Sequence, residues 1–98
     1  MKRDDAIREL TRRETRLREM GARALYLFGS TAKDCATEKS DLDVFIDYDK
    51  DSRFNAFDLV GIKLFLEEEL NANVDLTTRN GLHPALRERI IESSVKVF

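Results

Sequence analysis

The first half of the chain shows two different periods of apolar and polar residues, and each period predicts an element. From Arg3 to Met20 the apolar residues recur at three- and seven-residue steps, with acidic residues near the start and a glycine after the end. This pattern is typical of an amphipathic helix. Residues 24–28 form a short, almost wholly apolar run, whereas residues 41–46 alternate between apolar and polar positions. Both runs predict strands.

The second half of the chain continues this succession of helices and strands. Residues 54–70 have a helical period, and residues 73–77 have the pattern of a third strand. A turn at 79–81 precedes a final helix that begins at Pro84, and Ser30 is placed to cap a short helix over residues 31–35. The side chains expected to face the sheet are Phe57, Val60 or Gly61, Leu64 and Phe65 in the long helix, and Leu86, Ile90 and Ile91 in the final one.

The order of these elements, αβαβαβα, predicts a fold of the α/β (α+β) class, in which a small mixed sheet is flanked by helices. A chain of 98 residues is near the lower end of ordinary domain size. Residues 1–98 are therefore expected to form a single domain with one core.

The charge pattern excludes some classes of function. The formal net charge is -2, with basic residues gathered before residue 24 and acidic residues in excess after it. No broad basic surface is predicted, so direct nucleic-acid binding is not expected. No apolar run approaches the roughly 20 residues that cross a membrane. The single cysteine, Cys35, is unable to form an internal disulfide, which fits a reducing cytoplasm.

Three groups of residues carry the candidate chemistry. Gly29 and Ser30 follow the first strand, Asp41 and Asp43 lie two residues apart on the second, and Asp75 lies in the third. Side chains alternate along a strand, so the two-residue spacing directs both Asp41 and Asp43 to one face. Carboxylates held together in this way are costly unless a cation lies between them.

Magnesium suits such a site because it prefers oxygen ligands and takes several of them from water and substrate phosphates. With Asp75 as a third acid, the residues predict a site for two Mg²⁺ ions, the arrangement that many phosphoryl-transfer enzymes use. Gly29 would let the backbone approach a phosphate, and Ser30 at a helix start would offer a hydroxyl and N–H groups to an anion.

The run Phe28-Gly29-Ser30, followed after ten residues by Asp41-Leu42-Asp43 and later by Asp75, closely resembles the polymerase-beta-type nucleotidyltransferases. It is most similar to their smallest members, the MNT-domain proteins. The resemblance implies that Gly29 and Ser30 hold the triphosphate of ATP and that Asp41 and Asp43 bind both Mg²⁺ ions. It also implies that Asp75 binds the catalytic ion and helps to activate the acceptor hydroxyl.

The resemblance further implies a partner. Stand-alone proteins of this kind commonly pair with a HEPN-domain ribonuclease toxin, and several resemble antitoxins that transfer AMP to a tyrosine of that toxin. The chain departs from many relatives after the Gly-Ser pair, where Lys33 stands in a stretch that is often rich in arginine. Lys33 keeps a positive charge for the nucleotide, but as a point charge without the planar fork of an arginine.

Two other functions fit the same residues. One is an antitoxin that silences its toxin by binding alone, and the other is the catalytic subunit of a small-molecule nucleotidyltransferase. A calcium loop over residues 47–58 is a weaker reading, because Ser52 replaces the glycine that the sharp turn needs and Asp58 replaces the longer bidentate glutamate.

Overall fold

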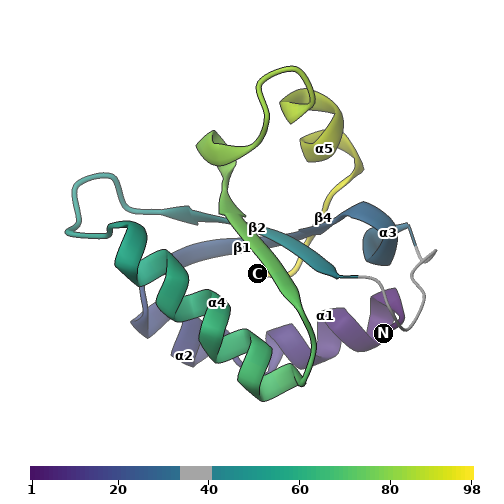
Figure 1. Ribbon diagram of the computed structural model, residues 1–98, viewed down its shortest axis with the longest axis horizontal. Helices are drawn as coiled ribbons and strands as arrows, with labels where there is room; N and C mark the ends of the chain where they lie inside the picture. The colour runs from purple at the N-terminus through teal and green to yellow at the C-terminus, as the bar shows by residue number, and fades with distance from the viewer. Residues whose placement is uncertain (34–40) are drawn as a thin grey trace.

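A four-stranded mixed sheet with helices around it forms the protein, as a computed structural model that describes residues 1–33 and 41–98 shows (Figure 1). This architecture confirms the predicted fold class. The helices are α1 (Arg3–Thr11), α2 (Glu14–Glu19), α3 (Gly29–Ala32), α4 (Ala56–Leu70), the short 3-10 helix η1 (Arg79–Gly81) and α5 (Arg87–Ser93). The strands are β1 (Ala22–Phe28), β2 (Leu42–Tyr48), β3 (Val74–Thr78) and β4 (Val95–Lys96).

The strands lie in the order β3-β2-β1-β4. β1 pairs antiparallel with both β2 and β4, whereas β2 and β3 are parallel and are connected through α4. Three of the four strands were predicted, within one or two residues of their bounds. β4 was not, because two residues are too short to show a period.

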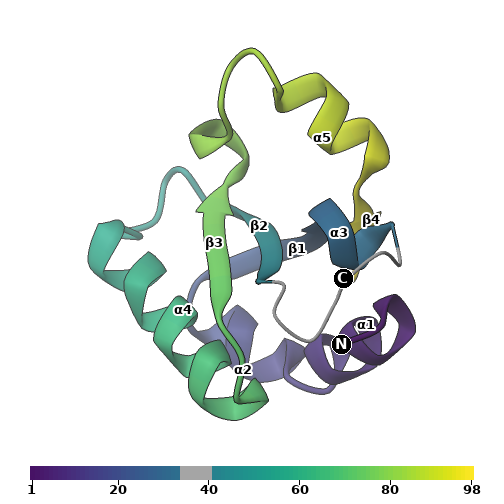
Figure 2. The same ribbon diagram turned by 45° about the vertical axis from the view of Figure 1, so that its right-hand side comes forward.

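One face of the sheet holds the hydrophobic core. Figures 1 and 2 show α1, α2 and α4 on this side of the sheet and α5 on the other. The alternation of β2 is as predicted, since Leu42, Val44 and Ile46 are all buried in this core. The helices contribute Ala6, Leu10, Leu17, Ile62 and Leu66, and the neighbouring strands contribute Leu25, Leu27, Val74 and Leu76.

Helix α4 begins and ends with clear local signals. The Asn55 side chain accepts hydrogen bonds from the backbone N–H groups of Phe57 and Asp58, and Asp58 accepts one from the Asn55 backbone in return. This reciprocal capping box satisfies N–H groups that have no partner inside the helix. Asn71, with φ 49°, ends the helix in the left-handed conformation that glycine or asparagine usually adopts.

The predicted inward face of α4 is largely wrong. Ile62 and Leu66 are fully buried, whereas Phe57 is 88% exposed, Val60 51% and Leu64 57%. Of the residues expected to face the sheet, only Phe65 packs against the core. The helix is apolar on nearly all sides, so the sequence period did not determine which side the sheet covers.

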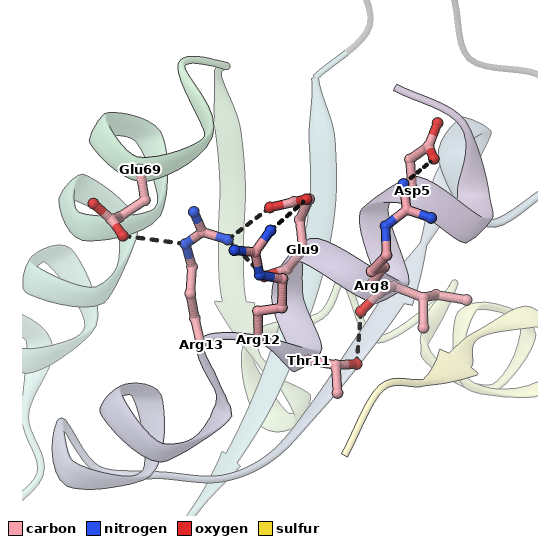
Figure 3. A network of polar contacts seen from close by, with 8 residues as sticks. Asp5, Arg8, Glu9, Thr11, Arg12, Arg13 and Glu69 are labelled. Carbon is pink, nitrogen blue, oxygen red and sulfur yellow. Dashed lines mark hydrogen bonds and ion pairs between the residues drawn. The ribbon is translucent and has the colours of Figure 1, made fainter.

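The predicted helix over residues 3–20 is in fact two helices, which separate at Arg12 and Arg13. Arg13 connects this region to α4: its guanidinium donates to Glu9 Oε2 at 3.0 Å and to Glu69 Oε1 at 3.3 Å (Figure 3). The break has no glycine or proline to mark it. Leu10 and Leu17, one on each helix, both reach the core.

The elements around the candidate site also differ in detail from the prediction. α3 begins at Gly29, two residues earlier than expected, and Cys35 lies outside the described residues. α5 begins at Arg87 and not at Pro84; Ile90 and Ile91 are partly buried, but Leu86 is 46% exposed. Within residues 1–33 and 41–98, no helix has the length and apolar character to span a membrane.

Candidate active site

Two of the candidate acids, Asp43 and Asp75, lie on the face of the sheet opposite the core, and Asp41 directly precedes β2. Phe28, Asp43 and Asp75 are register partners on β1, β2 and β3, so their side chains form one row across three strands. Tyr26, Phe45 and Thr77 form the adjacent row on the same face. Asp75, on the third strand, is thus on the same face as Asp43, as predicted.

The charges of both Asp41 and Asp75 act on the carboxyl group of Asp43. Partial burial raises the pKa of Asp43 to about 6 from its ordinary value of 3.8, and the charges of Asp75 and then Asp41 add to this rise. Like charges disfavour ionisation of a carboxyl group when they are near. Asp43 is therefore the partly buried member of the group, and Asp41 and Asp75 are exposed.

Gly29 lies directly beside the Asp43 carboxylate. A Cβ atom on residue 29 would be 3.1 Å from Asp43 Cγ and closer still to Oδ2, and the backbone at Gly29 has φ +74°. Both facts require glycine here. The strand β1 ends at this bend, and α3 begins there, which puts Ser30 and Lys33 just beyond the acids. The predicted cap by Ser30 is wrong, since Phe28 occupies the cap position and α3 has no side-chain cap.

The metal site is not assembled in full. Among residues 1–33 and 41–98, no group of three or more Asp, Glu, His or Cys side chains is arranged to hold a metal ion. The donor chemistry nevertheless suits magnesium, because Asp43 carries an unfavourable charge that a cation would relieve. An ion held by Asp43 with Asp41 or Asp75 would complete its ligands with water and phosphate oxygens.

An aromatic and basic cluster, which the sequence did not reveal, continues the open face beyond the acids. The rings of Tyr26 and Phe45 stack with their centroids 4.8 Å apart, and the Arg79 guanidinium lies 4.9 Å above the Tyr26 ring. Arg79 also makes a bidentate pair with Asp47, at 2.8 and 3.0 Å. This cover explains why Phe45 is fully buried although it faces away from the core.

A hollow of about 360 Å³ lies between the end of β1 and α5, and Gly29 lines it. Phe28, Gly29 and Lys33 line one side, and the α5 residues Arg89, Ile90 and Ser93, with Leu86 before them, line the other. The sequence indicated Gly29 and Lys33 but none of the residues on α5. Of the residues on that side, Leu86 and Ile90 had been expected to face the sheet, and no role had been predicted for Arg89 or Ser93.

Comparison with known proteins agrees with this geometry. A family model described as a nucleotidyltransferase domain matches residues 10–97. A protein of Methanocaldococcus jannaschii named "putative protein adenylyltransferase" is 36% identical over 78 residues, which cover 80% of this chain and 82% of the relative. A second protein of that organism, with the same name, is 28% identical over 99% of this chain and 100% of its own length.

Solved structures share the fold. One described as a "putative minimal nucleotidyltransferase" has a TM-score of 0.77 and 31% identity, and the match covers 97% of this chain and 95% of the other. A toxin-antitoxin structure with AMP-PNP has a TM-score of 0.73 at 18% identity, with 90% and 72% of the two chains covered. A Shewanella oneidensis complex of a tri-AMPylated HEPN toxin with its MNT antitoxin has a TM-score of 0.64 at 16% identity, with 90% and 68% covered.

The two structures with low identity show the fold alone. The family model spans most of the chain, and the minimal nucleotidyltransferase is similar in both sequence and structure over nearly its whole length. The shared region includes the Gly29 bend and the strands that carry Asp43 and Asp75. This chain therefore belongs to the nucleotidyltransferase domain family.

Proposed function

We propose that this nucleotidyltransferase is a magnesium-dependent protein adenylyltransferase, which transfers AMP from ATP to a hydroxyl group of a HEPN-domain toxin and so acts as its antitoxin. The observation that carries the proposal is the alignment of Asp43 and Asp75 on adjacent strands beside the Gly29 bend. The names of the relatives support a protein as acceptor, and the MNT and HEPN complex supports the kind of partner.

The geometry supports a specific division of work among the residues. Gly29, Ser30 and Lys33 would hold the triphosphate, and Asp41, Asp43 and Asp75 would hold magnesium, which when bound offsets negative charge on the phosphates. The acceptor oxygen attacks the α-phosphorus and forms a new O–P bond. The bond from that phosphorus to the bridging oxygen breaks, pyrophosphate leaves, and the hydroxyl proton passes to Asp75.

The test is transfer of label from α-labelled ATP. The purified chain, Mg²⁺ and its co-purifying partner are incubated together, and Asp41→Asn and Asp43→Asn are compared with Asp51→Asn, an exposed acid in the loop after β2. We expect label on the partner with the unaltered chain and with Asp51→Asn, and none with the other two. Mass spectrometry of the labelled partner then identifies the acceptor residue, which we expect to be a tyrosine.

The same experiment separates the two other functions. If Asp41→Asn and Asp43→Asn still neutralise the toxicity of the partner, without transferring label, the chain is an antitoxin that acts by binding alone. Label that appears only on an added small molecule, and never on the partner, would show a small-molecule nucleotidyltransferase. Either result contradicts the proposal.

A further inference from the structure

The hollow beside Gly29 has the character of an anion site. Two basic side chains line it from opposite sides, Lys33 next to α3 and Arg89 on α5. Among the described residues that line it, none is acidic, and Ser93 adds a hydroxyl group. Two basic side chains that face one partly enclosed space favour a negatively charged ligand there.

Arg89 has no other evident task in the fold. It is exposed, and among residues 1–33 and 41–98 its guanidinium makes no hydrogen bond or ion pair. The neighbouring arginine of α5, Arg87, differs in this respect, because it donates to the backbone oxygen of Asn80 at 3.1 Å. Arg89 therefore keeps all its donors for a ligand, whereas Arg87 supports the connection from η1 to α5.

The position of the hollow relative to the acids suggests which part of a ligand would enter it. The Asp43 carboxylate lies against Gly29, and Gly29 also lines the hollow. A triphosphate whose α-phosphorus lies beside Asp43 would run past the Gly29 backbone toward Lys33. Its terminal phosphates would then reach the space between Lys33 and Arg89.

We propose that Arg89 binds the β- and γ-phosphates of the nucleoside triphosphate from the α5 side, opposite Lys33, and holds the pyrophosphate that leaves. This inference rests on the proposed function, because it takes the reacting phosphorus to lie at Asp43. An arginine makes bidentate hydrogen bonds to phosphate oxygens and so supplies the planar fork that Lys33 lacks. The chain thus has an arginine for the triphosphate on its last helix.

Binding measurements test this assignment without any need for turnover. Isothermal titration with Mg²⁺ present would compare a non-hydrolysable ATP analogue, inorganic tripolyphosphate and AMP on the unaltered chain, Arg89→Ala and Arg89→Lys. The control is Arg23→Ala, since Arg23 is also an exposed arginine but lies at the opposite end of β1 from Gly29. Circular dichroism would check that each variant is folded.

We expect Arg89→Ala to weaken the binding of the ATP analogue and of tripolyphosphate about tenfold, which corresponds to about 1.4 kcal/mol. The same substitution should change the affinity for AMP less than twofold. Arg89→Lys should lie between, and Arg23→Ala should match the unaltered chain. Unchanged triphosphate binding by Arg89→Ala, or an equal loss for AMP, overturns the assignment but leaves the proposed function standing. Absence of triphosphate binding by the unaltered chain overturns both.

Discussion

Gly29 and Asp43 share a space that has room for only one side chain. The Asp43 carboxylate fills the position that a Cβ atom on residue 29 would take, and the positive φ of Gly29 turns the chain away from β1 at the same point. The bend that would hold a phosphate and the acid that would hold a metal are therefore one unit. A side chain added at residue 29 would collide with the Asp43 carboxylate.

We expect Gly29→Ala to destabilise the fold by about 1 to 3 kcal/mol, because it combines a strained backbone with a collision against Asp43. Urea denaturation gives the loss. The double variant Gly29→Ala with Asp43→Ala should recover part of the lost free energy of unfolding, because the collision is removed and only the strained φ remains. Gly61→Ala is the matched control: among the described residues, no atom outside the backbone of its own helix lies within 4 Å of the added Cβ, and a helical alanine should stabilise by up to about 1 kcal/mol. Equal effects at both glycines would contradict this account.

Asp43→Asn should make the metal-free protein more stable at pH 7. The pKa of Asp43 is about 6 in the fold and 3.8 ordinarily, so the folded state binds the proton more tightly. Its contribution to stability is complete below pH 4 and is lost as the pH rises through 6. A shift of two units gives almost 3 kcal/mol, which partial exposure reduces to about 1 to 2 kcal/mol. The comparison is urea denaturation with EDTA at pH 4 and pH 7, and a gain that does not grow with pH would count against it.

Magnesium should reverse this penalty in the unaltered chain. A ligand that binds only the folded state at 100 times its Kd stabilises by about 2.7 kcal/mol, so the melting temperature should rise with Mg²⁺ concentration. Asp43→Asn should abolish the rise and Asp41→Asn should reduce it. Asp51→Asn, in the acidic loop after β2, should behave as the unaltered chain. A rise that persists in Asp43→Asn would place the ion elsewhere.

Arg79→Ala should destabilise the open face of the sheet by about 1 to 2 kcal/mol, because it leaves the half-buried Asp47 without its bidentate partner. Arg79→Lys should restore less than half of this, since an ammonium group lacks the planar fork. Arg8→Ala is the control, as its pair with Asp5 is well exposed and should contribute less than about 0.5 kcal/mol. Denaturation midpoints of all three variants, measured at neutral pH, decide the comparison.

The orientation of α4 has its own test. Ile62→Ala should cost about 2 to 4 kcal/mol because Ile62 is fully buried. Phe57→Ala should cost less than about 0.5 kcal/mol because that ring is 88% exposed. Thermal denaturation of the two variants would show the difference directly. If Phe57→Ala were the more destabilising of the two, α4 would pack on the sheet through the face that the sequence pattern predicted.

The pattern of apolar and polar residues predicted most of the fold and the sheet face of Asp43, but it did not predict the buried face of α4. The alternation in β2 separates the core residues Leu42, Val44 and Ile46 from Asp43, so the sheet face was determined by sequence. In α4 both sides are apolar, and only the tertiary packing selects Ile62 and Leu66.

Other features depend on contacts between distant segments. The parallel register of β2 with β3 brings Asp43 and Asp75 together, and no local signal fixes a register. Arg79 pairs with Asp47 across 32 positions, and Arg89 lines the same hollow as Gly29 because α5 packs near β1. The residue pattern of a single helix or strand does not show which residues of another element it contacts.

The position of β3 at the edge of the sheet affects how large an acceptor molecule could reach the acids. β3 is an outermost strand, and Asp75 on it is exposed, so the acids open to the side of the molecule and not into a closed chamber. A hydroxyl group on the surface of a folded macromolecule could reach them without prior unfolding of that macromolecule. Selectivity would then come from how the surfaces of the two macromolecules fit together.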